Sequence, residues 1–446
     1  MTRINGRPAA GLLPLCLLFT GCATTSSLEL PLQAALAPEV AALRHEGIAT
    51  TQPLTIAQIA ALAVQNNPDL IALRAQHGVA QAQVLQAGLL PNPQVTGAYL
   101  PLVAGVGTTS AWNAGISADI RSLITLSSAR RAAKANAEQI DAQILWQEWQ
   151  TIGQARLLSV DIVEADRTLA LLRQNGELLA GRYRKSRQAM LAGNETLTGS
   201  TPDLAAWQAI KTQIHDQERQ QLTRRHQLNA LLGLAPDATL TLSPMPDIPA
   251  WNPDAVVAEL PVLAEHRPDL VALQLGYRAQ NAKLRSAILS RFPNLTIGVT
   301  GGSDNSNVRN FGPQVTLELP IFNQNQGNIA IETATRQQLH DEYAARLTAA
   351  TGQVQALVAE INLLTHQLES VGSDLAGTRQ VASKAEAAFK AGNIDERSYV
   401  DLVSTRLAKE QEIISIEQSL LDQRVAIATL VGAGMPAITL PPGDET

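Results

Sequence analysis

Apolar residues recur along residues 343–378 in alternating steps of four and three, and no proline interrupts them. The series comprises Tyr343, Leu347, Ala350, Val354, Leu357, Ile361, Leu364, Leu368, Val371 and Leu375. This seven-residue period predicts one long helix with a coiled-coil seam. Because such a seam winds around a straight helix, the helix needs partner helices along its length.

The same register occurs 199 residues earlier in the chain, with one glycine in place of a leucine. It falls on Ala155, Leu158, Ile162, Ala165, Leu169, Leu172, Gly176 and Leu179. A second stretch repeats independently, because seven positions are identical between residues 68–87 and 268–287. The chain is therefore predicted to be an internal duplication of two similar halves.

Each half also contains residues that alternate with a period of two, which predicts two-faced strands. The expected strands lie at residues 92–103, 112–120, 294–303 and 314–321, one hairpin to each half. A length of about ten residues with one apolar face matches a transmembrane β-barrel strand, and a soluble sandwich edge is the alternative. Four strands cannot enclose a pore, so a barrel requires several copies of the chain.

The longest predicted elements are helices at residues 122–190 and 325–390, each of roughly 100 Å. Both end in Ala-Gly-Asn, at Gly193 and Gly392, where a left-handed residue stops a helix. Return helices are expected at residues 202–232 and 396–431. Each half thus reads as short helix, short helix, β-hairpin, long helix, tip and return helix.

Six segments follow from this plan. They are a signal peptide at 1–21, a lipid tether and extended lead-in at 22–53, a first repeat at 54–235, a linker at 236–255, a second repeat at 256–434 and a tail at 435–446.

The first residues have the pattern of an export signal, with two arginines, a short apolar core and Phe19-Thr20-Gly21-Cys22 at the end. This arrangement resembles a bacterial lipoprotein signal, which implies a covalent lipid on Cys22. Ala23 follows the cysteine, where an aspartate favours retention in the inner membrane, so an outer-membrane destination is expected. An ordinary secretory signal with an incidental Cys22 is the alternative.

Composition narrows the possible functions. A formal net charge of −6 argues against nucleic acid as a partner. The seven histidines are scattered without metal-ligand spacing, and no phosphate loop, zinc-protease motif or nucleophile elbow occurs. We therefore expect no catalytic residues, no metal site, no cofactor other than the lipid, and no enzyme activity.

The repeated plan resembles the outer-membrane efflux protein (TolC-like) family, in its lipid-anchored branch, over residues 54–434. The sharpest motifs are the doubled Pro-Asp-Leu after Asn67 and Arg267, and the turn sequence of residues 319–327. The resemblance implies a mainly α chain with a small transmembrane β part. Three chains would close a twelve-stranded β-barrel and a twelve-helix α-barrel, and seams that lack a partner in one chain would pack against neighbouring copies.

The resemblance also implies a function and partners. Such homotrimers sit in the cell outer membrane, extend into the periplasm and passively conduct substrates. They are joined to an inner-membrane transporter by a periplasmic adaptor. The alternative is a lipid-anchored periplasmic coiled-coil scaffold or pump adaptor. The cargo cannot be inferred from the sequence.

Five residues are candidates for channel function. Asp119 and Glu318 lie 199 apart on the polar strand faces, which predicts a lumen acidic ring that favours cations. Asp401 resembles an aspartate at the family's periplasmic gate, and Gly193 and Gly392 are expected to contact the adaptor. The simpler alternatives are a solvated interior for the ring, an ordinary helix acid for Asp401 and plain helix caps for the glycines.

Overall fold

The computed structural model describes residues 27–50, 53–248, 250–432, 435 and 438. The predicted signal peptide and Cys22 lie outside the described residues. The described residues from Ala37 onward form one compact unit, and residues 27–36 belong to another. Within the described part of the chain, no helix is both long enough and apolar enough to span a membrane.

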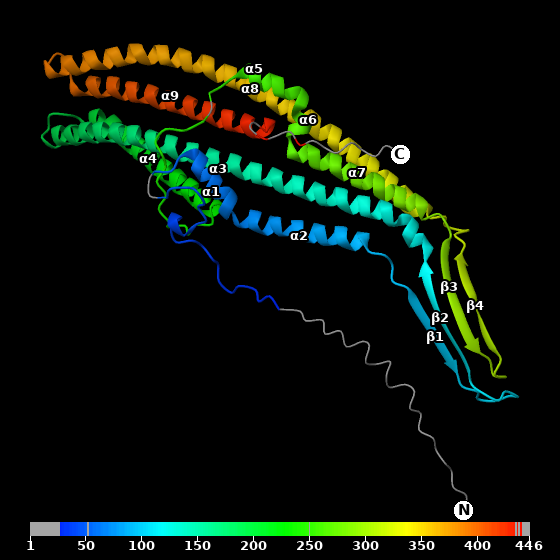
Figure 1. Ribbon diagram of the computed structural model, residues 1–446. Coiled ribbons are helices and arrows are strands. Elements are labelled where there is room, and N and C mark those ends of the chain that lie inside the picture. Colours follow the sequence, from blue (N-terminus) through cyan, green and yellow to red (C-terminus); the bar gives the residue numbers. More distant parts are fainter. Residues whose placement is uncertain (1–26, 51–52, 249, 433–434, 436–437, 439–446) are drawn as a thin grey trace, which may run out of the picture. The chain divides into compact units, whose positions relative to one another are not determined.

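The first half of the chain follows the predicted plan (Figure 1). After a short 3-10 turn, η2 (Val40–Ala42), come α1 (Ile56–Asn66), α2 (Pro68–Gly88), β1 (Gln94–Leu100), β2 (Ala111–Asp119), α3 (Ile120–Leu191) and α4 (Leu197–Leu231). The side chain of Thr55 forms a capping box with Gln58 at the start of α1. The side chain of Asn67 caps α2, whose first residue is proline.

The second half repeats the same order. Its elements are α5 (Pro253–Glu259), η3 (Leu260–Val262), α6 (Leu263–His266), α7 (Pro268–Leu289), β3 (Asn294–Ser303), β4 (Arg309–Glu318), α8 (Gln326–Lys390) and α9 (Glu396–Val431). The long helices were predicted closely, and the predicted return helix at residues 396–431 coincides with α9. The mainly helical fold with a small four-stranded sheet is confirmed.

One predicted helix start is wrong. The first return helix was expected to begin at Pro202, but α4 begins at Leu197 because the Thr196 side chain accepts a hydrogen bond from the Gly199 amide. Pro202 consequently lies within the first turns of α4, where it removes one N–H donor without ending the helix.

The four strands form one antiparallel sheet in the order β1-β2-β3-β4. The central pair, β2 and β3, joins the two halves of the chain, with Ile116 opposite Val299 and Asp119 opposite Thr296. One face of the sheet is apolar and open to the surroundings. Its exposed members are Val95, Tyr99, Trp112, Ile116, Ile297, Val299, Phe311, Val315 and Leu317. The other face is rich in Asn, Thr, Ser, Gln and Gly.

Glycines allow β2 and β3 to lie close together on that polar face. A Cβ atom added to Gly298 would stand 2.4 Å from the Ile116 carbonyl oxygen, and one added to Gly302 would stand 2.5 Å from the Trp112 carbonyl oxygen. Both distances are far below van der Waals contact, so only glycine fits at these two positions.

The two halves differ where a strand passes into a long helix. In the first half β2 leads directly into α3, whose first amides are capped by the Asp119 carboxylate. In the second half β4 was expected to reach Ile321 but ends at Glu318, because Pro320 has no amide to continue the ladder. A turn then leads to α8, with Gln324 and Asn325 at positive φ.

Helix α3 lies in the middle of the packing, against α1, α2, α4, α7 and α9. Helix α8 packs against α7 and α9. The partner helix that the α8 seam requires lies, for part of the seam, within the same chain. Val354 and Ile361 belong to one buried cluster with Leu420 and Ile427 of α9, since the return helix folds back along the seam.

Candidate functional site

Both helical tips have the geometry that the Ala-Gly-Asn sequences predicted. Gly193 and Gly392 take φ values of 73° and 75°. In each tip the glycine amide and the following asparagine amide donate to carbonyls of the last helical turn, at 2.8–3.1 Å, which is the Schellman pattern. A Cβ atom on either glycine would meet nothing within 4 Å, so both tips are open to an approaching partner.

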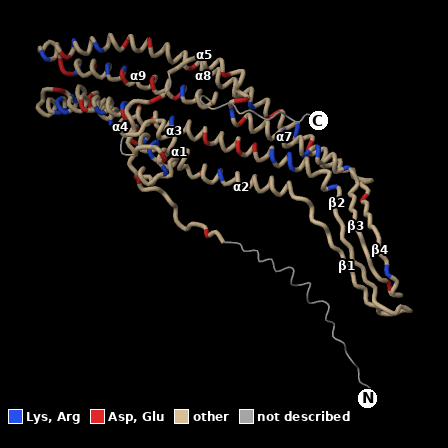
Figure 2. Tube along the Cα trace, in the orientation of Figure 1, with Lys and Arg blue, Asp and Glu red and all other residues tan. Residues whose placement is uncertain are grey.

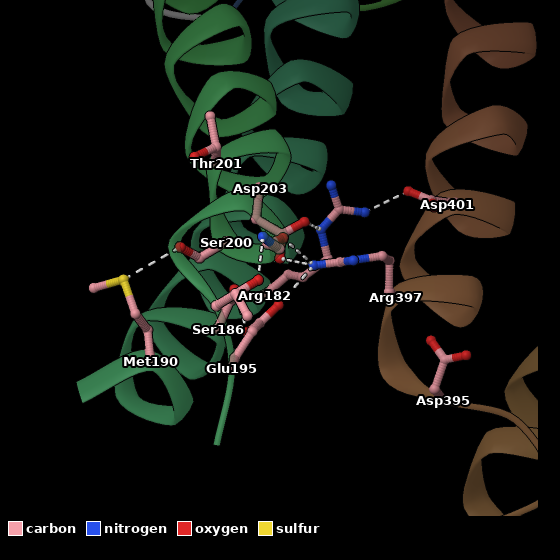
Figure 3. Close-up of polar contacts among 12 residues, drawn as sticks. Arg182, Ser186, Met190, Glu195, Ser200, Thr201, Asp203, Asp395, Arg397 and Asp401 are labelled. Carbon is pink, nitrogen blue, oxygen red and sulfur yellow. Dashed lines mark hydrogen bonds and ion pairs between the residues drawn. The ribbon is translucent and has the colours of Figure 1, made fainter. Parts of the chain in front are cut away.

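Close to the tips, a charged cluster connects the two hairpins (Figure 3). We call Arg182 of α3, Asp203 of α4, and Arg397 and Asp401 of α9 the hairpin latch. The Arg182 Nε lies 3.0 Å from Asp203 Oδ1, and its Nη1 donates to Asp401 Oδ1. Asp203 also receives Arg397 Nη2 at 2.8 Å on its second oxygen. The predicted gate residue Asp401 is therefore tied to α3 of the first half.

Burial distinguishes the members of the hairpin latch. The side chains of Arg182 and Asp203 are 8% and 2% exposed, whereas that of Asp401 is 61% exposed. The hydrogen bond that Arg397 donates to the Asp203 carboxylate raises the pKa of its guanidinium above the usual value. Arg182 and Asp203 form the buried pair of this network, and breaking a buried ion pair by removal of either residue destabilises a protein by about 3–5 kcal/mol. Asp203 is therefore the structural centre, and Asp401 is its solvent-facing end.

Further polar contacts connect the hairpins around the latch. Lys185 of α3 lies 2.8 Å from Glu396 of α9. The Ser404 hydroxyl of α9 donates a hydrogen bond to Asn175 Oδ1 of α3 at 2.7 Å. The sequence did not point to Arg182, Asp203 or Arg397, because charged residues on helices this polar carry no distinguishing period.

Each hairpin also has its own aromatic pair near the tip. Tyr183 stacks on Trp207 with ring centres 5.2 Å apart, and Phe389 stacks on Tyr399 at 4.9 Å. Each pair connects a long helix to its return helix. The tips are therefore held as firm hairpins, and the charged contacts between them are a separate layer of interaction.

The second candidate region lies where the sheet meets the helices. Asp119 and Glu318 both line one cleft of about 1090 Å³, together with Arg121 and Lys283. The fold thus brings these two carboxylates to one cleft within a single chain, and the lumen acidic ring itself stays a prediction. Asp119 has a further role that was not predicted, because it accepts hydrogen bonds from the Arg121 amide at 2.9 Å and from Ser122.

A third group of charges lies midway along the helices. Burial, and then the nearby Asp161 carboxylate, raise the pKa of Asp422 to about 7. Asp161 itself accepts a hydrogen bond from Gln418 and lies 3.6 Å from Arg224. Oxygen Oδ1 of Asp422 is buried without a hydrogen-bond partner. Among the described residues, no three His, Cys, Asp or Glu side chains gather in a way that could hold a metal ion.

Comparison with known proteins now adds to this geometry. The sequence profile of the family described as "Outer membrane efflux protein" matches residues 260–433. The chain is 24% identical to the pyoverdine export outer membrane protein OpmQ of Pseudomonas putida over 85% of its length and 86% of that protein. It is 22% identical to the cobalt-zinc-cadmium resistance protein CzcC of Cupriavidus metallidurans, over 79% of this chain and 83% of CzcC.

Two further comparisons concern a lipoprotein and the fold. The probable outer membrane lipoprotein SilC of Salmonella typhimurium is 24% identical over 38% of this chain, and the match spans only 39% of SilC. The outer-membrane channel OprN has the same fold, with a TM-score of 0.69 at 15% identity over 93% of this chain and 99% of that one. The CmeC outer membrane channel of Campylobacter jejuni gives 0.69 at 15% identity, over 94% and 96% of the two chains.

The matched profile covers α7, both strands of the second half, α8 and α9. The fold match extends the likeness to the first half, where the profile does not reach. The matched profile is that of outer membrane efflux proteins, and the two matched structures are outer-membrane channels. The chain is thus similar to the outer membrane efflux proteins over its second half, and its fold is that of solved outer-membrane channels, in agreement with the repeated plan.

Proposed function

We propose that this protein is the outer-membrane exit duct of a tripartite efflux system, passively conducting substrates from a periplasmic pump to the outside. The observation that carries the proposal is the isolated sheet, which has one apolar face exposed and one polar face lined by small residues. Such a sheet is stable when its apolar face meets lipid and its edges are closed by other copies of the chain. Trimeric closure would place four strands from each copy in one barrel.

Conductance tests this proposal directly. The detergent-extracted protein is expected to have the mass of a trimer and to form steady channels in planar bilayers. A monomer or dimer without conductance would favour the alternative, a lipid-anchored periplasmic scaffold or adaptor. In that case the exposed apolar face of the sheet would have to be covered by a protein partner.

We propose further that the hairpin latch is part of the closed periplasmic gate. Arg182 holds the first hairpin to Asp401 of the second, so separation of the hairpins requires these ion pairs to break. Asp401→Ala is expected to raise closed-state conductance several-fold while leaving the fold intact, because its side chain is exposed. Asp395→Ala is the matched control, since the hydrogen bonds of that exposed acid are made with Ser398 of its own helix. Unchanged conductance in Asp401→Ala would remove the gate proposal.

The remaining site residues enter the same proposal. Asp119 and Glu318 of three copies would form the lumen acidic ring, and exchange of Glu318 for Gln is expected to lower the preference for cations over anions.

Gly193 and Gly392 would contact a periplasmic adaptor, which crosslinking from the tips would capture. Cys22 would carry the lipid, and Cys22→Ser would then lose incorporation of labelled palmitate. Unaltered selectivity, tips that never capture an adaptor, or unchanged labelling would each remove the corresponding assignment.

A further inference from the structure

Two stretches next to the sheet are strongly basic. Residues 120–136 at the start of α3 and residues 278–291 at the end of α7 contain no Asp or Glu, although the chain as a whole is acidic. Their basic residues are Arg121, Arg130, Arg131, Lys134, Arg278, Lys283, Arg285 and Arg291. Figure 2 shows blue positions on α3 and α7 close to the strands.

The fold brings these two stretches together. Helix α3 follows β2 without a break, and α7 ends a few residues before β3 begins. Helices α3 and α7 pack against each other, and β2 pairs with β3. The basic stretches therefore lie at the same end of the sheet, on neighbouring helices.

The basic residues divide between two sides of these helices. Arg121 and Lys283 line the cleft that holds Asp119 and Glu318, on the polar side of the sheet. Arg130, Arg131, Lys134 and Arg285 are exposed and do not line this cleft. We call these four residues the basic collar.

Exposed apolar residues lie between the basic collar and the sheet. On α3 they are Leu123 and Ile124, which are 43% and 44% exposed. Beside α7 they are Ile288 and Phe292, at 46% and 56%. None of the four lines the cleft. Helical periodicity places Ile124 and Arg131 on one face, seven residues and therefore about 10 Å apart along the axis.

This order of side chains matches the edge of a bilayer. Exposed apolar residues suit the end of the hydrocarbon region, and the headgroup layer beyond it is about 5–8 Å thick. Arginine and lysine at that depth attract anionic headgroups by about 1 kcal/mol for each basic side chain. The protein as a whole has a negative net charge, so the attraction of these four basic residues for anionic lipid is confined to this part of its surface.

We propose that the basic collar binds the headgroups of anionic phospholipids in the leaflet that surrounds the periplasmic end of the sheet. This inference rests on the proposed insertion of the sheet into a membrane. The side of α3 and α7 that lines the cleft would then face the channel, and the side with the basic collar would face lipid.

Lipid-dependent stability of the purified, delipidated full-length protein tests the proposal. The melting temperature of the detergent-solubilised oligomer is measured with added dioleoyl phosphatidylglycerol and, separately, with dioleoyl phosphatidylcholine. These lipids share their acyl chains, so a difference reports the headgroup. We expect phosphatidylglycerol to raise the melting temperature by several degrees more, and 0.5 M NaCl to reduce that difference, since salt screens exposed charges.

A matched pair of variants locates the effect. Exchange of Arg130, Arg131, Lys134 and Arg285 for Gln is expected to abolish the preference for phosphatidylglycerol. A control variant exchanges four basic residues far from the sheet for Gln and should keep the full preference. They are Arg173 of α3 and Lys211, Arg219 and Arg225 of α4. If the collar variant does not fold, individual Arg131→Gln and Lys134→Gln variants should each lose part of it.

Two outcomes would overturn the proposal. One is a wild-type protein that responds equally to both lipids, and the other is a collar variant that retains the full difference. Conductance in bilayers of neutral lipid separates this result from the exit-duct proposal. If the protein conducts there but shows no headgroup preference, only the collar proposal is refuted. If the protein enters no bilayer, the collar proposal and the exit-duct proposal are both refuted.

Discussion

The two halves of this chain share one plan but not one environment. In α3, twenty residues are buried, whereas the equivalent helix α8 buries seven. Glu164 of α3 is 1% exposed, and Leu363, which lies 199 residues later at the equivalent position of α8, is 58% exposed. The buried residue is charged and the exposed one is apolar, which reverses the usual order.

Position in the fold explains this reversal. Helix α3 is enclosed by neighbours from both halves, and Glu164 is held there by Arg167 at 2.7 Å. Helix α8 lies at the edge, so its apolar Leu363 has no cover from the described part of the chain. Duplication gives the two helices the same local structure, and a further copy of the chain would give the edge helix the cover that α3 already has.

The largest expected effect concerns the sheet, where both halves should behave alike. Ile116→Lys in β2 and Val299→Lys in β3 each place a charge on the apolar face, at a cost of about 2–4 kcal/mol near the bilayer midplane. Both variants are expected to lose insertion, measured as protein in the outer-membrane fraction and as conductance. Thr300→Lys on the polar face is the control, and an equal loss there would contradict the assignment of the faces.

The exposed face of α8 is the next test. Leu363→Glu gives α8 the residue that α3 has, but without a matching arginine. If a second copy of the chain covers this face, an unpaired carboxylate should cost several kcal/mol and dissociate the oligomer. Mass measurement of the extracted protein reports the result. Asn362→Glu, on an exposed neighbouring position, should leave the oligomer whole, and an intact Leu363→Glu oligomer would show that this face is not an interface.

A smaller effect is expected at Asp422, because the equivalent position of α4 is Thr223, which cannot ionise. The pKa of Asp422 is about 7 in the folded chain, above its usual value of 3.8, so the unfolded chain loses this proton first as the pH rises. The stability of the folded state should therefore fall between about pH 4 and pH 7. Asp422→Asn should flatten that fall and raise the melting temperature at pH 7.5 by roughly 2–4 °C. A variant that melts as the wild type does from pH 5 to pH 8 would refute this.

The smallest effects are expected at the tips, where the halves are most alike. Gly193→Ala and Gly392→Ala each require an alanine at positive φ, which costs about 1–2 kcal/mol. Space is available for either methyl group, so the two losses of unfolding free energy should be equal within about 0.5 kcal/mol. Denaturant unfolding measures both, and clearly unequal losses would mean that the tips are not equivalent.

Sequence patterns predicted the elements better than they predicted the contacts between them. The seven-residue period and the Ala-Gly-Asn tips located α3, α8 and α9 closely, since these signals are local. The start of α4 was predicted too late because a proline such as Pro202 is typical of the first helical turn, whereas the Thr196 side chain caps the helix earlier in the chain. The buried pair of Arg182 and Asp203 could not be found, since a local pattern does not show which helices meet.

For the cleft residues too, the sequence pattern predicted the position in an element but not the contacts. Alternation along the strands predicted that Asp119 and Glu318 lie on the polar strand faces, and in the sheet both residues line one cleft. It did not show that Asp119 would cap α3. The Asp119 carboxylate accepts hydrogen bonds from the first amides of α3 because the helix follows the strand directly, without a turn. The basic collar was likewise invisible as a unit, since its members come from helices that are distant in the sequence.

Gly298 and Gly302 restrict how this protein can change over generations. Each lies where any side chain would collide with a backbone carbonyl of β2, so nearly every missense change there would be purged. The outer strands β1 and β4 have no such restriction at most positions and can accumulate variation on the polar face of the sheet. Divergence of the sheet is therefore expected to begin in its two outer strands and to spare β2 and β3, which join the two repeats.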